Sequence, residues 1–160
     1  MYDRVGDAPC YAMVRDQFAF LQRIVREHDG AIVKTIGDAI MAAFVDPAQG
    51  MRTAFAIQQE IEDFNALHPD LPLSIKLGMH HGPCIAVNLN DRLDYFGTTV
   101  NLAARLEGQS KGGDVVISES LRGDPAVAEL LEATAVDVER YETPIKGFDE
   151  HFVLYRLTLQ

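Results

Sequence analysis

The sequence is poor in basic residues. Fourteen lysines and arginines stand against 24 aspartates and glutamates among 160 residues, which gives a net charge of −10. This balance argues against a nucleic-acid binder, which needs a broad basic face, and against an anionic membrane surface as partner. No stretch approaches the roughly 18 uninterrupted apolar residues of a membrane-spanning helix, so we expect no direct membrane contact. The N-terminus has no apolar core and is not a signal peptide.

Cysteine is also scarce. Cys10 and Cys84 are too few for a disulfide scaffold and indicate ordinary thiols in a reducing, cytoplasmic environment. Internal repeats, low-complexity runs and Pro/Gly-rich linkers are absent, so residues 1–160 are predicted to form a single domain. Its 48% apolar and 24% charged residues are typical of a globular fold with a sizeable core.

The order of secondary structure follows from the apolar periodicity. Helices are predicted over residues 9–28, 47–67 and 98–107, with short helices after Ser118 and over 125–131. Strands are predicted over residues 31–36, 39–44, 73–79, 115–117, 136–141 and 152–157; residues 84–87 are expected to continue the strand 73–79, and residues 88–93 to form a polar turn.

This order is that of an α+β fold with a ferredoxin-like βαββαβ core and a C-terminal extension, except that no strand precedes the first helix. In that layout the first strand lies inside the sheet, and without it inner strand edges lie open. We therefore expect the chain to lack the first strand of its fold, which lies upstream of Met1 or is supplied by another segment.

The most informative stretch is KTIGDAIMAAF (Lys34–Phe44), which places Asp38 at the tip of a hairpin. A carboxylate there can point out of the sheet toward a metal ion. Aspartate is also common at such tips for reasons of turn chemistry alone, and that interpretation is favoured for this stretch by itself.

A second stretch is DYFGTTVNLAAR (Asp94–Arg105). Asn101 and Arg105 lie four residues apart and share one face of the predicted helix. A guanidinium beside a carboxamide suits an anionic oxygen and a sugar. Taken alone, a solvated helix face with Arg105 near Glu107 is the simpler interpretation.

Two further features are weaker. Lys146 in PIKGF (Pro144–Phe148) is a lone lysine between strands, and most such lysines are simply exposed. His80 and His81 are neighbours on a strand and face opposite sides, so they do not chelate one ion, and we expect a structural role.

Together the three stretches resemble the class III nucleotidyl cyclase catalytic domain, the family of adenylyl and guanylyl cyclases. The resemblance runs from the first helix to the last strand and outweighs the simpler interpretations given above. It implies a nucleotide cyclase fold and a reaction in which the 3′-hydroxyl of a nucleoside triphosphate attacks the α-phosphate and pyrophosphate leaves. It also implies two metal ions, Mg²⁺ or Mn²⁺, held by two aspartates. Asp38 matches the second aspartate, and the first belongs to the missing strand.

The resemblance assigns the remaining roles residue by residue. Arg105 matches the arginine that stabilises charge on the α-phosphate, and Asn101 matches the residue that orients the ribose. Lys146 resembles the triphosphate lysine. Lys34 and Asp94 match the two residues that contact the purine.

Hydrogen bonding then favours ATP as substrate. Lys34 can only donate and ionised Asp94 can only accept, which complements the N1 acceptor and exocyclic amine of adenine. Guanine presents the reverse pattern. Since one chain carries residues from both halves of the family's site, we expect a homodimer with shared sites.

We expect this domain to be cytoplasmic, either free or as the cytosolic domain of a larger or membrane-attached protein whose regulatory domains lie elsewhere. The alternative is a cyclase-like domain without turnover, which acts as a nucleotide sensor or a regulatory dimerisation module. An RNA-binding ferredoxin-like module has the right topology but the wrong charge, and lacks an exposed aromatic pair on a strand.

Overall fold

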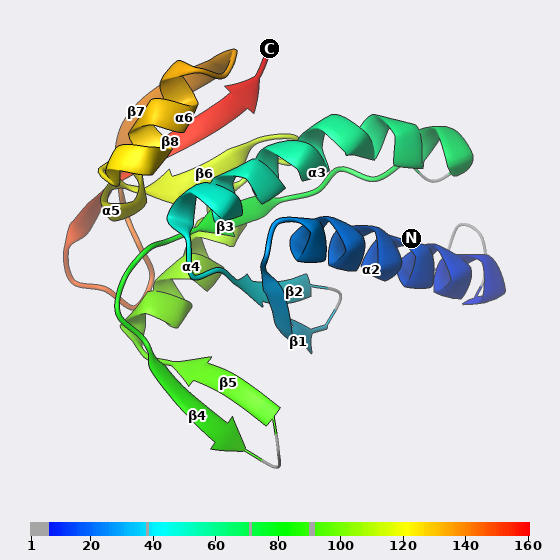
Figure 1. The fold of residues 1–160 in the computed structure, drawn as a ribbon, viewed down its shortest axis with the longest axis horizontal. Helices are drawn as coiled ribbons and strands as arrows, with labels where there is room; N and C mark the ends of the chain where they lie inside the picture. Colours follow the sequence, from blue (N-terminus) through cyan, green and yellow to red (C-terminus); the bar gives the residue numbers. More distant parts are fainter. Residues whose placement is uncertain (1–6, 38, 71, 90–91) are drawn as a thin grey trace.

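The computed structural model of the chain describes residues 7–37, 39–70, 72–89 and 92–160. Its elements in chain order are α2 (Asp7–Glu27), β1 (Ala31–Ile36), β2 (Ala39–Ala43), α3 (Pro47–Leu67), β3 (Leu77–Met79), β4 (Ile85–Leu89), β5 (Arg92–Phe96), α4 (Thr98–Gln109), β6 (Val115–Ser118), α5 (Glu119–Arg122), α6 (Pro125–Glu132), β7 (Val136–Pro144) and β8 (His151–Leu159) (Figure 1). Among the described residues, no helix is both long enough and apolar enough to cross a membrane.

The largest sheet is four-stranded, with the strand order β3-β6-β8-β7. β3 runs parallel to β6, whereas β6 and β7 each pair antiparallel with β8. All four residues of β6 are buried, because helices cover both faces of the sheet. Val115 and Ile117 pack with α3, α5 and α6 on one face, and Val116 packs with α4 on the other. The sheet therefore fixes where α4 lies.

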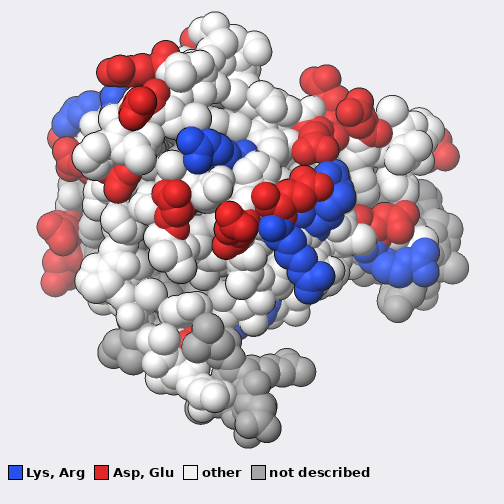
Figure 2. All heavy atoms as spheres, viewed as in Figure 1, with Lys and Arg blue, Asp and Glu red and all other residues white. Residues whose placement is uncertain are grey.

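The two long helices, α2 and α3, pack against each other. α3 begins where the Asp46 side chain accepts a hydrogen bond from Ala48 N at 3.0 Å, with Pro47 in the first turn. Phe20 of α2 and Phe64 of α3 meet with ring centroids 5.1 Å apart, inside an apolar cluster that also contains Ile75. On the face shown in Figure 2, acidic and basic side chains are interspersed.

Two hairpins stand apart from the four-stranded sheet. β1 pairs antiparallel with β2, and β4 pairs antiparallel with β5 in a hairpin that projects from the body (Figure 1). Within the described residues, β2 pairs only with β1 and β3 pairs only with β6, so each has an open edge. The helix–strand–strand–helix–strand order predicted from the sequence is confirmed. The additional strand expected before the first helix, which would lie inside the sheet, stays a prediction.

Three expectations about local structure were wrong. The strand predicted over residues 73–79 is a strand only from Leu77, because side chains of α3 satisfy the backbone before it. Asn65 bonds both the N–H and the carbonyl of Leu73, and the Gln58 amide donates to the Ile75 carbonyl at 3.0 Å. Residues 84–87 do not continue that strand, and residues 88–93 are not simply a polar turn. Residues 85–89 form β4 and residues 92–93 begin β5, and Asn88 pairs with Leu93 across this hairpin.

Candidate active site

Helix α4 presents Asn101 and Arg105 on its exposed side because its other side is buried. Leu102 and Leu106, at 5% and 0% exposure, pack against the β6–β8 face of the sheet. The residues just before each leucine therefore point outward, as the spacing of four predicts. The side chains of Asn101 and Arg105 are both exposed.

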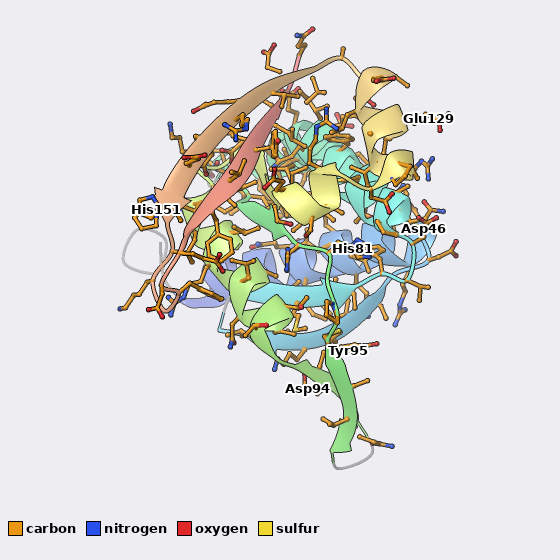
Figure 3. All side chains as sticks on the ribbon, turned by 90° about the vertical axis from the view of Figure 1, so that its left-hand side faces the viewer. Asp46, His81, Asp94, Tyr95, Glu129 and His151 are labelled. Atoms are coloured by element: carbon orange, nitrogen blue, oxygen red, sulfur yellow. The ribbon has the colours of Figure 1, made fainter. Side chains whose placement is uncertain are left out.

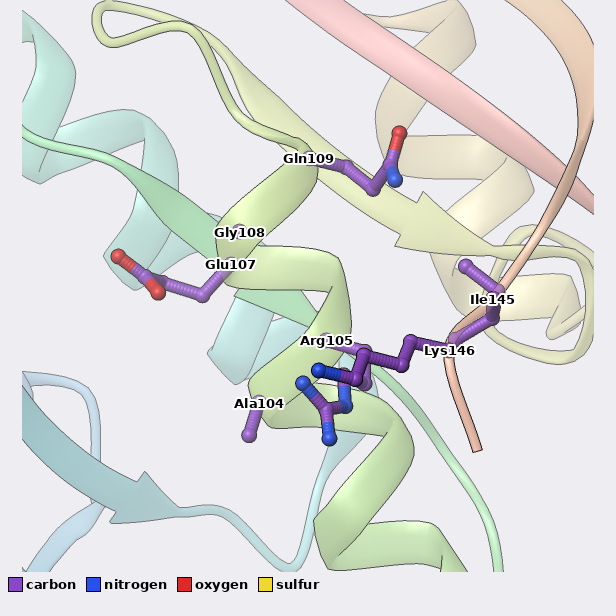
Figure 4. Close-up of a pocket in the computed structure, with 7 residues that line it drawn as sticks. All are labelled: Ala104, Arg105, Glu107, Gly108, Gln109, Ile145 and Lys146. Atoms are coloured by element: carbon purple, nitrogen blue, oxygen red, sulfur yellow. The ribbon is translucent and has the colours of Figure 1, made fainter. Parts of the chain in front are cut away.

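Arg105 and Lys146 line one cavity of about 400 Å³, although they are 41 positions apart in the sequence (146 − 105 = 41). In Figure 4 the two side chains extend toward one another from α4 and from the segment after β7. Ile145, only 3% exposed, packs beside Leu102 and Leu106 and so fixes the position of the residue that follows it. The structure brings together two residues that the sequence placed in separate motifs.

The charges at this cavity suit an anion. Neither Arg105 nor Lys146 lies within 4.0 Å of a carboxylate oxygen belonging to a described residue. Glu107 also lines the cavity, but in Figure 4 its side chain extends away from the two cations. The ion pair between Arg105 and Glu107 considered from the sequence is therefore not formed. Two exposed cations at one cavity favour an anionic ligand such as a phosphate group.

Lys34 and Asp94 form an ion pair, with Lys34 Nζ 3.2 Å from Asp94 Oδ2. Their side chains are 37% and 19% exposed, so the pair is reachable from solvent. The hydrogen bond that the Tyr95 backbone N–H donates to Asp94 lowers the pKa of Asp94 below its ordinary value, and the neighbouring Lys34 lowers it further. Asp94 is therefore an ionised, acceptor-only group at neutral pH.

The two hairpins bring this pair together. Asp94 lies on β5 opposite Val87 of β4, near the body of the molecule (Figure 3). Lys34 lies on β1, where the register with β2 shifts between Ile32 and Lys34. Such a bulge re-aims the side chain that follows it. Lys34 and Asp94 are 60 positions apart in the sequence, and the geometry of these strands brings them into contact.

The remaining predicted site residues have different outcomes. Asn101 is exposed on α4 but does not line the cavity that contains Arg105 and Lys146. Asp38 lies outside the described residues. Within the described part of the chain, no group of three or more His, Cys, Asp or Glu side chains is arranged to hold a metal ion. The structure therefore forms two pairs, Lys34 with Asp94 and Arg105 with Lys146.

Sequence reasoning missed the residues that hold these pairs in place. Gly97 precedes α4 with a φ of +125°, a conformation that favours glycine, and so lets β5 turn directly into the helix. Ile145 anchors the second pair. A glycine directly after the aromatic pair Tyr95-Phe96, and an isoleucine directly before the lone lysine, were signals available in the sequence.

Comparison with known proteins identifies the family. Residues 2–157 match the family model described as the adenylate and guanylate cyclase catalytic domain. The chain belongs to this family. Its mixed α/β fold is that of nucleotide cyclase catalytic domains, as the resemblance implied.

Relatives of both kinds are found within the cyclase family. The chain is 34% identical to guanylate cyclase 2D from Rattus norvegicus over 146 residues, which cover 84% of this chain and 13% of that protein. It is 30% identical to an adenylate cyclase from Anabaena cylindrica over 162 residues, which cover 92% of this chain and 32% of that protein. The cyclase domain thus spans a third or less of the length of these two relatives.

A solved structure supports the same fold. The guanylate cyclase domain of RhGC from Catenaria anguillulae, solved in complex with GTP, aligns with a TM-score of 0.80. The alignment covers 99% of this chain and 88% of that chain at 23% sequence identity. At this identity the similarity establishes the fold of the chain. Which nucleotide the chain binds has to be argued from its own residues.

Proposed function

We propose that this cyclase domain converts ATP to 3′,5′-cyclic AMP and pyrophosphate. The observation that carries the proposal is the Lys34–Asp94 ion pair, with 3.2 Å between Nζ and Oδ2. It places a group that only donates beside a group that only accepts. Such a pair can distinguish adenine from guanine, because the two purines carry different hydrogen-bond donors and acceptors on the same edge.

Adenine fits this pair in one orientation. Its N1 accepts a hydrogen bond from Lys34, and its exocyclic amine donates one to Asp94. Guanine offers a protonated ring nitrogen where adenine has N1, and a carbonyl where adenine has the amine. It would therefore leave both charged side chains facing groups of the wrong kind. The lowered pKa of Asp94 supports the assignment, because a protonated Asp94 would lose this discrimination.

Arg105 and Lys146 act on the phosphates. Lys146 attracts the triphosphate as a point charge, and the planar guanidinium of Arg105 donates to the oxygens of the α-phosphate, where negative charge grows as the 3′-hydroxyl attacks. Asn101, on the same exposed side of α4, orients the ribose. Arg105 is therefore expected to act on kcat, and Lys146 on nucleotide binding.

Divalent metal ions, Mg²⁺ or Mn²⁺, belong to the proposal through the family resemblance. When bound, they activate the attacking hydroxyl and hold the phosphates. Asp38 is the proposed ligand. The described residues do not by themselves supply a metal site, since no three ligating side chains cluster there.

The site is proposed to form between two copies of the chain. In the family, the metal aspartates come from one domain and the nucleotide contacts from the other, and this chain carries residues of both kinds. Asp38→Ala and Arg105→Ala proteins, each inactive alone, should regain partial activity when mixed, because one site of the mixed dimer is intact. No recovery in confirmed mixed dimers would exclude shared sites.

The proposed function is tested on the full-length protein with ATP and Mn²⁺, with cyclic AMP and pyrophosphate measured together. Arg105→Ala should abolish most turnover, whereas Arg140→Ala, which removes an exposed arginine of β7, should not. ATP binding without turnover would instead identify a nucleotide sensor or a regulatory dimerisation module. The greater length of the relatives suggests that regulatory domains lie elsewhere in the parent protein.

A further inference from the structure

A polar cluster lies where β3 and β6 end side by side. The strands are parallel, with Met79 opposite Ile117, so His80 and Ser118 follow at the same edge of the sheet. His80 Nδ1 lies 2.6 Å from the Ser118 hydroxyl, and that hydroxyl lies 3.1 Å from the Ser120 hydroxyl. Ser120 in turn donates to the His81 carbonyl at 2.7 Å. The proposed function uses none of these groups.

The hydrogen bonds of the two serines favour a proton on Nδ1 of the imidazole. Ser120 has one hydroxyl proton, and the His81 carbonyl takes it. The contact between Ser118 and Ser120 is then a hydrogen bond only if Ser118 is its donor. With its proton used in this way, Ser118 can only accept from His80, so Nδ1 carries a proton. Burial and the neighbouring His81 lower the pKa of His80, which favours the neutral ring. His80 Nδ1 therefore donates to the Ser118 hydroxyl, and it also lies 3.3 Å from the Ser120 hydroxyl, which can accept because its own proton goes to the His81 carbonyl.

His80 lies in the middle of a segment that runs along α4, residues 78–83, which we call the α4 support. At one end of the support, a β-carbon on Gly78 would lie 2.1 Å from Glu107 N, so the helix backbone rests directly on β3. At the other end, the Thr99 hydroxyl in the first turn of α4 donates to the Pro83 carbonyl. The N-cap residue of α4, Gly97, provides no side-chain cap. The support therefore contacts both ends of the helix that carries Asn101 and Arg105.

His80 and Thr99 lie on either side of the Gly82 position. A β-carbon on Gly82 would lie 3.2 Å from His80 Nε2 and 2.9 Å from Thr99 Oγ1, so any larger residue would force one of these side chains to move. Only two residues separate His80 from Pro83, so the backbone that His80 anchors also carries the Pro83 carbonyl to which Thr99 donates.

We propose that His80 is a positioning residue of the cyclase site, which holds the α4 support against Ser118 and thereby aligns Arg105 with the nucleotide. The consequence for turnover rests on the proposed function. The structural part of the proposal does not rest on it: the imidazole is neutral with a proton on Nδ1, and it fixes the start of α4. The two parts are therefore tested by different measurements on the same variants.

The first measurement needs no activity. Imidazole nitrogen chemical shifts of the full-length protein should identify the Nδ1–H tautomer of His80, and an Nε2–H tautomer would overturn the proposal. In His80→Ala, exchange of the Asn101 amide, whose bond to the Gly97 carbonyl closes the first turn of α4, should rise roughly fivefold or more, the factor expected for loss of a typical buried hydrogen bond. His80→Asn, whose amide nitrogen replaces Nδ1, should restore protection. Unchanged exchange in His80→Ala would refute the role.

The second measurement is kinetic. His80→Ala should lower kcat by roughly tenfold or more with little change in KM, and His80→Asn should recover most of it. His81→Asn is the matched control, because His81 takes part in the hydrogen bonds only through its backbone carbonyl, and its side chain affects only the pKa of His80. In an Arg105→Ala background, His80→Ala should have little further effect, since the group it aligns is gone. An equal loss in both backgrounds would show a general structural role and overturn the proposal.

A wild-type protein without turnover would refute the proposed function, while amide exchange would still decide the role of His80.

Discussion

Replacing Asp114 by alanine removes a carboxylate from the centre of the contacts that hold the C-terminal end of α4. Asp114 accepts hydrogen bonds from the Ser110 hydroxyl, from the Lys111 and Gly112 amides, and from Arg156 Nε at 2.8 Å. Arg156 in turn donates to the carbonyl of Gln109, the last residue of α4, at 2.7 Å. The Asp114 and Arg156 side chains are only 5% and 11% exposed.

The expected destabilisation follows from this burial. Removing one partner of a buried ion pair costs about 3–5 kcal/mol, because the other charge stays buried without compensation. Arg156 keeps its bond to Gln109, its cation–π contact with Tyr141 at 4.9 Å, and the exposed Glu139 at 3.7 Å. We therefore expect the lower end, about 3 kcal/mol, for Asp114→Ala. Arg23→Ala, which breaks ion pairs of a side chain that is 48% exposed, is the control, and we expect it to cost at most about 1 kcal/mol.

Urea unfolding of each variant at one fixed protein concentration measures these differences. The pH dependence gives a second check. Burial raises the pKa of Asp114, but the hydrogen bonds from Ser110, Lys111 and Arg156 together lower it below its ordinary value. The stabilisation is then present above the unfolded pKa of about 3.9 and is lost as the pH falls through the lower folded pKa. A cost for Asp114→Ala that stays below about 1 kcal/mol near pH 7 would refute the argument from burial.

Further variants test the packing of α4 and the division of labour at the cavity. Gly78→Ala should destabilise the fold by about 1–3 kcal/mol in urea unfolding, because its β-carbon meets the Glu107 backbone. Gly108→Ala is the control. Gly108 lies in α4 next to Glu107, and the space around its β-carbon is open, so this substitution should be neutral or stabilising. Arg105→Ala should lower kcat about 100-fold or more with little change in KM, whereas Lys146→Ala should mainly raise KM. Steady-state kinetics showing the reverse split would contradict the assigned roles.

The helices and the hairpin whose bounds depend on local apolar periodicity were predicted well from the sequence. The bounds of α3 were predicted to the residue, and those of α2 and the β1–β2 hairpin within two residues, because apolar spacing and Pro, Gly and Asp signals specify them. The error at residues 73–76 had a non-local cause. Asn65 and Gln58 of α3 satisfy that backbone, and no pattern within the segment shows it.

The same contrast applies to the site. Through the resemblance, the motifs assigned Lys34 and Asp94 to the purine and Arg105 and Lys146 to the phosphates, but they did not show which contacts bring each pair together. The pairing of Lys34 with Asp94 depends on a bulge in β1 and on the register of the β4–β5 hairpin. The meeting of Arg105 and Lys146 depends on how Ile145 packs against α4. Both are tertiary contacts over long sequence distances.

The most direct test of adenine selection by Lys34 and Asp94 is the ratio of kcat/KM for ATP to kcat/KM for GTP, measured on the full-length protein with the same divalent metal. A site built to hydrogen-bond one base should favour ATP by on the order of 100-fold or more. The ratio should collapse toward one in Lys34→Ala and in Asp94→Ala, and should be unchanged in Arg140→Ala. Turnover of GTP as fast as ATP by the wild-type protein would contradict the account.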